Sequence, residues 1–259
     1  MLPATLDTMS AELRCALDPA AFAVERLRFA PDPWQARVMQ SPAKRVLLNC
    51  SRQAGKSTTT AIIGLHRAVY HAGSLVLLVS PSLRQSRELF GKVQGFLKAL
   101  DVQPQLDEDN RLSMALENGS RVVALPGDPS TIRGFSAPSL IIEDEAGYVE
   151  DGLYRAVRPM LAVSGGRLIL LSTPNGRRGH FFEAWESAED WERIEVPALE
   201  CPRISREFLE AERVALGETW FRQEYECKFV ETIHQLFRYD DIRRALSDDV
   251  KPLFAEEAA

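Results

Sequence analysis

Apolar positions along the chain follow two alternating patterns, short continuous runs and longer stretches in which they recur every three or four residues. Short runs bounded by turn residues are typical of buried strands, whereas the longer spacing predicts amphipathic helices. We therefore expect an α/β fold with a mostly parallel central sheet flanked by helices. The runs predicted as strands are Val46–Leu48, Leu75–Ser80, Leu140–Ile142, Arg167–Leu171 and Trp191–Val196.

The rest of the pattern predicts a hairpin and a set of helices. Asn118-Gly119 separates two apolar runs, which is a strong hairpin signal. From Pro197 onward the pattern is helical, and Ser205 is a good N-cap residue, so a small helical subdomain is expected there. The predicted helices include Thr8–Leu27, Leu83–Leu100, Asp151–Leu161, Ser205–Leu216 and Glu218–Lys228.

The bulk composition excludes several classes of protein. Of the 259 residues, 45% are hydrophobic and 26% are charged, as in ordinary globular proteins. No run approaches the ~20 apolar residues that span a bilayer, and the N-terminus does not resemble a signal peptide. The net charge of −6 argues against a domain that coats nucleic acid over its whole surface, but it leaves room for a local basic strip. The four scattered cysteines argue against a zinc site or disulfides and fit a reducing, cytoplasmic setting.

The strongest functional signal is the segment NCSRQAGKSTTT, between the first strand and the next helix. A strand, a small polar loop and a helix meeting at Gly55-Lys56-Ser57 form a phosphate-binding arrangement, in which loop N–H groups and the helix dipole attract an anion. Lys56 would reach the β- and γ-phosphates of ATP, and Ser57 would bind Mg²⁺. Because Cys50 replaces the usual first glycine and Arg52 lies inside the loop, a chance Gly-Lys-Ser loop is the alternative. The candidate nucleotide-binding residues here are Ser51, Arg52, Gln53, Ala54, Gly55, Lys56, Ser57 and Thr58.

A second signal is the run of three acids, Glu143-Asp144-Glu145, at the end of an apolar strand. Carboxylates at this end of a strand face the crevice where open parallel sheets bind ligands. Asp144 would support Mg²⁺, and Glu145 would accept a proton from the water that attacks the γ-phosphate. An ordinary acidic turn is the alternative. Glu143 is ambiguous, because a plain apolar run would continue through its position.

Two more polar segments are candidates for the same site. Gln35 opens a short helix upstream of the phosphate loop, and its amide can pair with the N6 and N7 edge of adenine. A helix start beside a half-buried Trp34 is the alternative interpretation. Ser172-Thr173-Pro174 follows a buried strand and could sense the γ-phosphate and move on its loss, whereas the alternative is an ordinary strand-to-helix turn.

These motifs, in this order, resemble the ATPase domain of the large terminase subunit of tailed bacteriophages. The likeness covers about Asp32 to Leu246, and it implies a P-loop ATPase of the additional-strand, catalytic-glutamate type with a helical lid. The implied division is an ATPase core over residues 1–196, a lid subdomain over 197–231 and a linker over 232–259. The segments that carry it are Cys50–Ser57, Ile132–Gly134, Leu140–Ala146, Leu171–Gly176 and Phe208–Tyr225.

Large terminases are ring-forming motors that pump viral DNA into an empty capsid through a portal. The resemblance implies a Mg²⁺-dependent ATPase whose partners are double-stranded DNA, other copies of the chain, the portal protein and the small terminase subunit, with no membrane. It would act in the host cytoplasm and transiently at the portal vertex. The family's nuclease half would follow the residues given, so no DNA cleavage is expected from this chain.

The resemblance also implies roles for individual residues. Ser172, Thr173 and Pro174 would couple hydrolysis to motion, and Gln35 would lie in the adenine motif. Arg133 is the preferred arginine finger, supplied by a neighbouring subunit, and Arg52 would act within its own chain; a structural loop arginine is the alternative for Arg133. Basic residues that could line a DNA channel are Arg84, Arg87, Arg121, Arg177 and Arg178.

Two other functions are compatible with these motifs. A helicase-like or other nucleic-acid-stimulated P-loop ATPase would be expected to carry a second RecA-like domain, and no second phosphate loop is found in the sequence. A nucleotide-gated assembly module would bind ATP and turn over little. Glu145 beside Asp144 argues against that module, because simple binding has no need of a positioned base.

Overall fold

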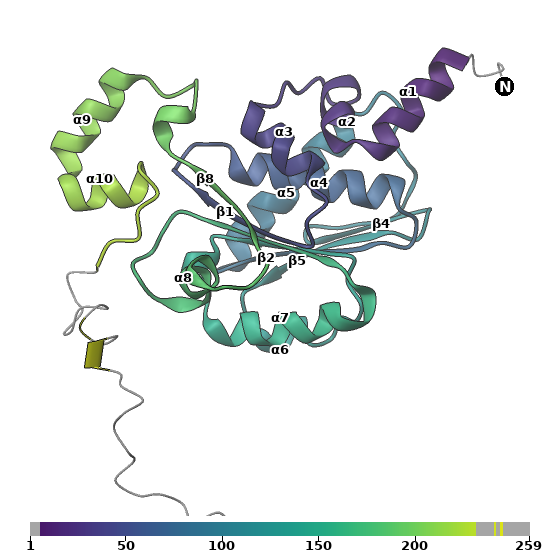
Figure 1. Cartoon of the computed structure of the whole chain (residues 1–259). Coiled ribbons are helices and arrows are strands. Elements are labelled where there is room, and N and C mark those ends of the chain that lie inside the picture. Colours follow the sequence, from purple (N-terminus) through teal and green to yellow (C-terminus); the bar gives the residue numbers. More distant parts are fainter. Residues whose placement is uncertain (1–5, 232–240, 242–243, 246–259) are drawn as a thin grey trace, which may run out of the picture.

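The central feature of the structure is an eight-stranded sheet with the order β3-β4-β5-β2-β6-β7-β1-β8 (Figure 1). The structure is a computed structural model that describes residues 6–231, 241, 244 and 245. β4 is antiparallel to both of its neighbours, β3 and β5, and all other neighbouring strands are parallel. The strands are β1 Arg45–Cys50, β2 Leu75–Ser80, β3 Leu106–Asp109, β4 Ser113–Leu116, β5 Arg121–Pro126, β6 Leu140–Asp144, β7 Arg167–Ser172 and β8 Glu192–Val196.

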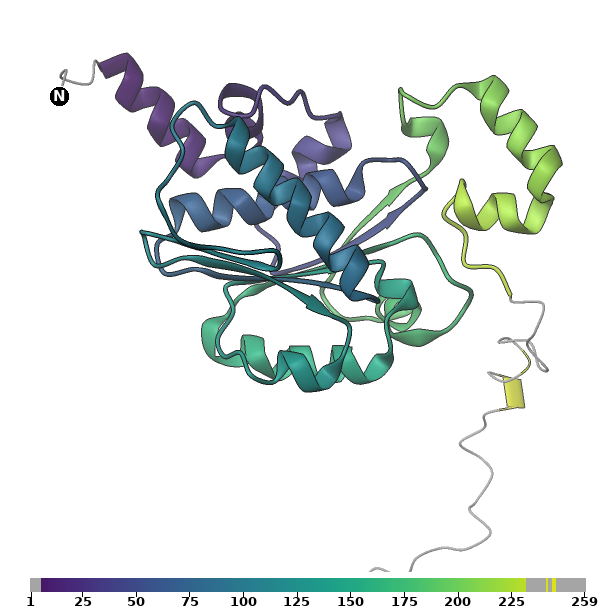
Figure 2. The same ribbon diagram turned by 180° about the vertical axis from the view of Figure 1, so that it is seen from behind.

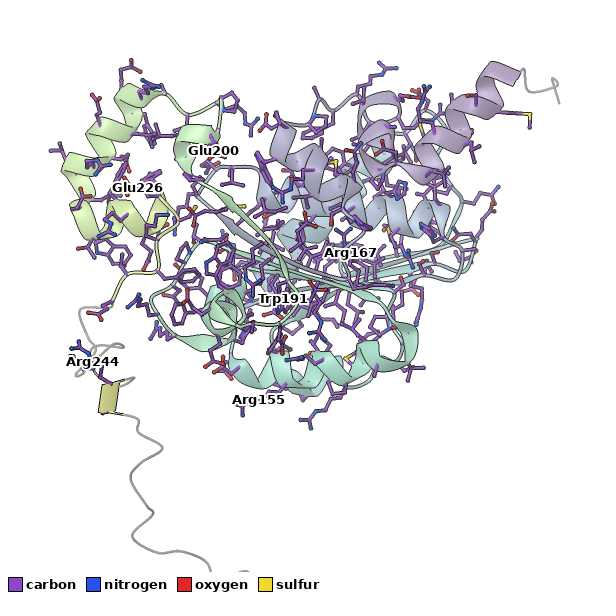
Figure 3. All side chains as sticks on the ribbon, in the orientation of Figure 1. Arg155, Arg167, Trp191, Glu200, Glu226 and Arg244 are labelled. Atoms are coloured by element: carbon purple, nitrogen blue, oxygen red, sulfur yellow. The ribbon has the colours of Figure 1, made fainter. Side chains whose placement is uncertain are left out.

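Helices cover both faces of this sheet (Figures 1 and 2). α1 to α5 lie on one face and α6 to α8 on the other, so each face buries its own hydrophobic cluster. Figure 3 shows the buried Trp191 within the layers and the exposed Arg155 on the outer side of α7. The helices of the two layers are α1 Leu6–Leu17, α2 Pro19–Glu25, α3 Pro33–Gln40, α4 Lys56–Tyr70, α5 Leu83–Ala99, α6 Pro129–Ile132, α7 Asp151–Ser164 and α8 Gly179–Glu186.

The strand order determines which motifs meet. β7 lies between β1, which leads into the phosphate loop, and β6, which carries the acids. Strands two places apart in a sheet are separated by about 10 Å, which leaves room for phosphates between their ends. The predicted fold class, a mostly parallel α/β sheet with an additional strand between the two nucleotide motifs, is confirmed.

The structure corrects one local prediction and adds one strand. The single helix expected over Thr8–Leu27 is divided into α1 and α2, because Asp18 accepts a hydrogen bond from the Ala20 N–H and Pro19 begins a new helix. β3 was not predicted, since its sequence LDED is exposed throughout and has no apolar alternation. The predicted hairpin is present as β4 and β5.

A small helical unit follows β8. It contains the short 3₁₀ segment η2 (Ala198–Glu200), α9 (Arg206–Leu216) and α10 (Glu218–Glu224), and it has its own apolar cluster around Leu209 and Phe221. It is joined to the sheet by the Asn49 Nδ2–H, which donates to the Cys227 carbonyl at 2.8 Å. The boundaries predicted for the three domains stay predictions, and the linker over 232–259 lies outside the described residues except for 241, 244 and 245.

None of the helices in the described part of the chain combines the length and the apolar character needed to cross a membrane.

Candidate nucleotide-binding site

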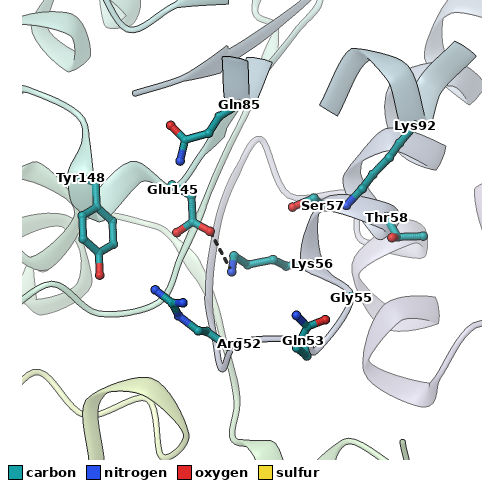
Figure 4. Close-up of a pocket in the computed structure, with 10 residues that line it drawn as sticks. All are labelled: Arg52, Gln53, Gly55, Lys56, Ser57, Thr58, Gln85, Lys92, Glu145 and Tyr148. Atoms are coloured by element: carbon teal, nitrogen blue, oxygen red, sulfur yellow. Dashed lines mark ion pairs between the residues drawn. The ribbon is translucent and has the colours of Figure 1, made fainter. Parts of the chain in front are cut away.

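The loop between β1 and α4 forms one wall of a cavity of about 500 Å³ (Figure 4). Gln53 and Gly55 adopt left-handed backbone conformations, with φ of 61° and 96°, which turn the chain sharply into α4. Gly55 is the N-cap of α4, and no side chain caps this helix end. The first N–H groups of a 15-residue helix are therefore available to an anion. The cavity is lined by Arg52, Gln53, Gly55, Lys56, Ser57, Thr58, Gln85, Lys92, Glu145 and Tyr148.

Lys56 and Glu145 form an ion pair inside this cavity, with Lys56 Nζ 3.1 Å from Glu145 Oε1 (Figure 4). Burial alone would lower the pKa of Lys56, but the charges of Glu145 and Asp144 outweigh it and raise the pKa. The lysine therefore stays charged. Its contact with Glu145 brings the phosphate-binding residue and the candidate base together.

Asp144 lies beside the start of α4, where Ser57 Oγ donates to Asp144 Oδ2 at 3.0 Å. Burial and the neighbouring charge of Glu145 raise the pKa of Asp144. A cation beside this carboxylate would offset both effects. The hydroxyl and carboxylate oxygens are the hard ligands that Mg²⁺ prefers, together with substrate phosphates and water. No cluster of three His, Cys, Asp or Glu side chains suited to a metal ion occurs among the described residues.

Glu145 leaves the direction of β6 abruptly. Its φ of 55° and ψ of 41° place it in the left-handed region, which residues other than glycine rarely adopt. This turn aims the carboxylate into the cavity, where the Ser172 hydroxyl approaches Glu145 Oε2 at 3.4 Å. Strain of this kind clusters at functional sites.

Arg52 connects the phosphate loop to α10. Its Nε lies 2.5 Å from Glu224 Oε2, and its backbone N–H donates to the Glu224 carbonyl at 3.2 Å. The charge of Glu224 is the main cause of the raised pKa of Arg52. The arginine thus lines the cavity while it is bound to the helical unit, and its action within its own chain stays a prediction.

Three predicted nucleotide contacts do not line the cavity. Gln35 is buried, its Oε1 accepts the Asp32 N–H at 2.9 Å, and its Nε2 lies 2.9 Å from the point where a Cβ on Gly55 would stand. Ser51 and Ala54 are fully buried. Ser51 and Ala54 belong to the loop itself, whereas Gln35 comes from α3, and the adenine role of Gln35 stays a prediction.

The predicted coupling residues Ser172, Thr173 and Pro174 are buried at the end of β7, beside the acids. The loop that they begin is bonded to two other elements. Asn175 Nδ2–H donates to the Gly147 carbonyl at 2.9 Å, and the Gly176 N–H donates to Gln223 Oε1 on α10 at 3.2 Å.

The arginines predicted to meet other molecules lie in different places. Arg133 is exposed at the end of α6 and does not line the cavity, so a role at this site would require another subunit. Arg84 and Arg87 are exposed on the first turns of α5, where Gln85 lines the cavity, and Arg177 and Arg178 follow β7. Arg121 begins β5 and therefore lies at the opposite edge of the sheet. The five DNA candidates do not form one surface.

Several residues at the site were missed. Gln85 and Lys92 are seven positions apart, so they share one face of α5, but a polar helix face normally indicates solvent. Tyr148 lies three residues after Glu145, and Glu224 belongs to the segment Phe208–Tyr225 that carried part of the resemblance. The buried position of Glu224 was the decisive feature, and only the fold reveals it.

A further missed residue is Arg203, which fastens the helical unit to the loop. Its guanidinium bonds to both oxygens of Asp32, at 3.1 and 2.8 Å, and donates to the Ala54 carbonyl at 3.0 Å. Two arginines thus connect the phosphate loop to the helical unit: Arg203 bonds to the Ala54 carbonyl, and Arg52 bonds to Glu224.

Comparisons with known proteins agree with this geometry. A family model described as the terminase large subunit, T4likevirus-type, N-terminal, matches residues 47–244. The terminase large subunit of Thermus phage G20c is 25% identical over 257 residues, which covers 85% of this chain and 53% of that protein. The chain thus spans about half the length of the curated relatives it matches.

Solved structures share the fold. A variant of the large terminase ATPase domain of Thermus phage P74-26 superposes with a TM-score of 0.73 at 22% identity, covering 83% of this chain and all of that one. The large terminase of a thermophilic bacteriophage, solved in complex with ADP, gives a TM-score of 0.63 at 11% identity over 77% of this chain and 54% of the other. At these identities the likeness shows the fold alone.

Proposed function

Because the chain belongs to the family of T4likevirus-type terminase large subunits, matching its N-terminal part, we propose that it is a Mg²⁺-dependent ATPase that drives double-stranded viral DNA into a procapsid. In this proposal it works as one member of a ring at the portal, with the small terminase subunit as a further partner, in the host cytoplasm. The contact that carries the ATPase proposal is the ion pair of Lys56 with Glu145 inside the cavity beside the phosphate loop.

The loop supplies the binding half of the reaction. The N–H groups at the start of α4 and the ammonium of Lys56 would bind the β- and γ-phosphates of ATP. Ser57 and Asp144 would hold Mg²⁺, which offsets the charge on the phosphate oxygens when it is bound. The raised pKa of Asp144 supports this role, because burial and the charge of Glu145 outweigh the charges of Lys56 and Lys92, and a bound cation would offset that excess.

Glu145 supplies the chemical half. Its Oε1 is paired with Lys56, and ATP would draw the lysine toward the phosphates. The freed carboxylate then accepts a proton from a water whose oxygen attacks the γ-phosphorus. The bond to the β–γ bridging oxygen breaks, and ADP and phosphate result. General-base catalysis of this kind contributes about 10²- to 10⁴-fold.

A neighbouring subunit would complete the site. We assign the finger to Arg133, because it is exposed outside the cavity of its own chain, whereas Arg52 is already bound to Glu224. An arginine finger contributes about 10³- to 10⁵-fold to kcat.

ATP turnover per chain, measured across a wide range of protein concentration, tests both halves of this proposal. The Glu145→Gln variant, which lacks the proposed general base, gives the background rate of turnover. Turnover per chain should rise with concentration, and Arg133→Ala should abolish the rise without changing nucleotide affinity. Flat turnover with a silent Arg133→Ala would mean that hydrolysis is complete within one chain and would remove the support for a ring. Equal turnover in Glu145→Gln and the unsubstituted chain would reject Glu145 as the base.

A further inference from the structure

The third acid of the run, Glu143, has no part in the mechanism above and is completely buried. Successive residues of a strand point to opposite faces, so Glu143 faces the α7 and α8 layer while Asp144 faces α4. Its Oε1 lies 2.7 Å from His180 Nε2. Its Oε2 has no hydrogen-bond partner among the described residues. The carboxylate therefore depends on His180 alone.

His180 is held on every side by polar or aromatic groups. Its Nδ1 lies 3.2 Å from Asp151 Oδ1, and its backbone N–H donates to the same oxygen at 2.8 Å. The Tyr154 ring stacks on the imidazole, with centroids 4.8 Å apart and planes at 13°. Both ring nitrogens face carboxylates, an arrangement that is satisfied when both carry protons. Burial lowers the pKa of His180, but the bonds and charges of Glu143 and Asp151 outweigh it and raise the pKa.

The position of His180 in the chain gives this cluster its significance. It is the second residue of α8, immediately after the loop that starts at Ser172. That loop is fixed to the β6 acids at its first end, where Ser172 approaches Glu145, and at its other end by His180 on Glu143. Gly147 allows Ser172 to lie this close to the segment that follows β6, because a Cβ on Gly147 would stand 3.0 Å from Ser172 Oγ.

The middle of the same loop contacts α10 of the helical unit, which is the predicted lid. The Gly176 N–H donates to Gln223 Oε1 on α10 at 3.2 Å, one residue before Glu224, which holds Arg52. The middle of this loop is thus bonded both to Gly147, through Asn175, and to α10, through Gly176. Such a loop would pass a displacement of Glu145 or Ser172 to α10, whereas a loop free at its far end would absorb it.

We propose that Glu143 and His180 are positioning residues that anchor the end of the loop from Ser172 to Gly179, so that the nucleotide state at Glu145 is transmitted to the lid helix α10. This inference rests on the proposed ATPase function. Neither residue touches substrate; they act by holding the loop in place between the base and the lid.

The test replaces the buried pair as a unit, because removing one partner alone would leave the other polar group unpaired. Glu143→Leu with His180→Phe is the apolar pair. His180→Gln is the conservative variant, since its amide can still donate to Glu143. Glu195→Gln with Lys228→Gln, which removes a partly exposed ion pair of 2.8 Å outside the loop, is the matched control.

The first readout is steady-state kinetics together with the affinity for a fluorescent ATP analogue. For the folded apolar pair we expect kcat to fall by up to about 10²-fold, the effect of a small misplacement far from the reacting atoms, with analogue affinity within about twofold. His180→Gln should recover most of kcat, and the control should match the unsubstituted chain. An unchanged kcat in the folded apolar pair, or a change in KM alone, would overturn the proposal.

The second readout does not depend on turnover. All four native cysteines are buried, so dyes can be attached at Lys98→Cys on α5 and Glu210→Cys on α9. A non-hydrolysable ATP analogue with Mg²⁺ should change energy transfer between them, and the apolar pair should lose this change. If the change persists in the apolar pair, or is absent from the unsubstituted chain, the anchor proposal is wrong. Absent turnover with an anchor-dependent lid signal would reject only the proposed function.

Discussion

The nucleotide cavity and the His180 cluster lie on opposite sides of the same strand end and draw on three consecutive acids. In the cavity, Glu145 is partly exposed and pairs with Lys56, which ATP would draw away in the proposed mechanism. In the cluster, Glu143 is fully buried and pairs with His180, which nothing from solvent can reach. By the pleat alone Glu145 would share the face of Glu143, and the left-handed turn at Glu145 is what directs its carboxylate into the cavity instead. Exposure and the exchangeability of the partner, more than residue type, decide the role.

The largest expected effect lies on the cavity side. Glu145→Gln keeps the shape of the side chain and removes the base, so kcat should fall about 10²- to 10⁴-fold while the free energy of unfolding changes little. Steady-state ATPase assays and urea unfolding measure the two quantities. A large loss of stability with residual turnover would show that Glu145, like Glu143, has a structural role, and would contradict the contrast between the two acids.

The opposite outcome is expected on the cluster side. His180→Leu leaves Glu143 buried without a partner, and breaking a buried pair in this way costs about 3 kcal/mol of unfolding free energy. Lys228→Ala, which breaks a surface ion pair, should cost at most about 1 kcal/mol. Urea denaturation of both variants provides the measurement. Equal losses would show that burial does not distinguish the two pairs.

A second buried histidine sharpens the comparison, because its partner is a carbonyl instead of a carboxylate. His66 Nε2 lies 2.9 Å from the Cys15 carbonyl oxygen, and burial lowers the pKa of His66 to about 4. As pH falls below about 6.5 the unfolded chain is protonated first, so folding loses stability. We expect His66 to account for about 2 kcal/mol lost between pH 7 and pH 5.

Urea unfolding at these two pH values would measure this loss, and His66→Phe should make the dependence shallower. His180 has the opposite sign, since its raised pKa gives a stabilisation that is present at low pH and lost as pH rises through the folded-state value. An unchanged pH dependence in His66→Phe would show that His66 is not buried in its neutral form.

The smallest effects are expected from exposed arginines outside both regions. If Arg84 or Arg87 contacts a DNA phosphate, its replacement by Ala should reduce the slope of log affinity against log salt by about 1. Arg121→Ala, at the opposite edge of the sheet, serves as the control and should leave the slope unchanged. Equal changes at both edges would remove the case for a binding surface at the nucleotide edge.

Periodicity and motif order predicted the sheet, the phosphate loop and the acids, because each of these signals lies within a short segment. They could not reveal contacts between distant segments. Arg52 was identified inside the loop, but its partner Glu224 lies 172 residues later. Glu143 stayed ambiguous because its meaning depends on His180, a residue from another helix. The contact of Gln35 with adenine stays a prediction, and a linear pattern could not reveal that this side chain is buried beside Gly55.

The left-handed backbone at Glu145 has a consequence for how such a sequence can change over generations. A glycine or asparagine would fit this φ with less strain, and relief of one such conformation is worth about 1 kcal/mol. Selection for thermal stability alone would therefore favour replacement of Glu145, which would remove the proposed general base. We therefore expect Glu145 to be retained only under selection for ATP hydrolysis. Thermally stabilised variants that have lost Glu145 should also have lost ATPase activity.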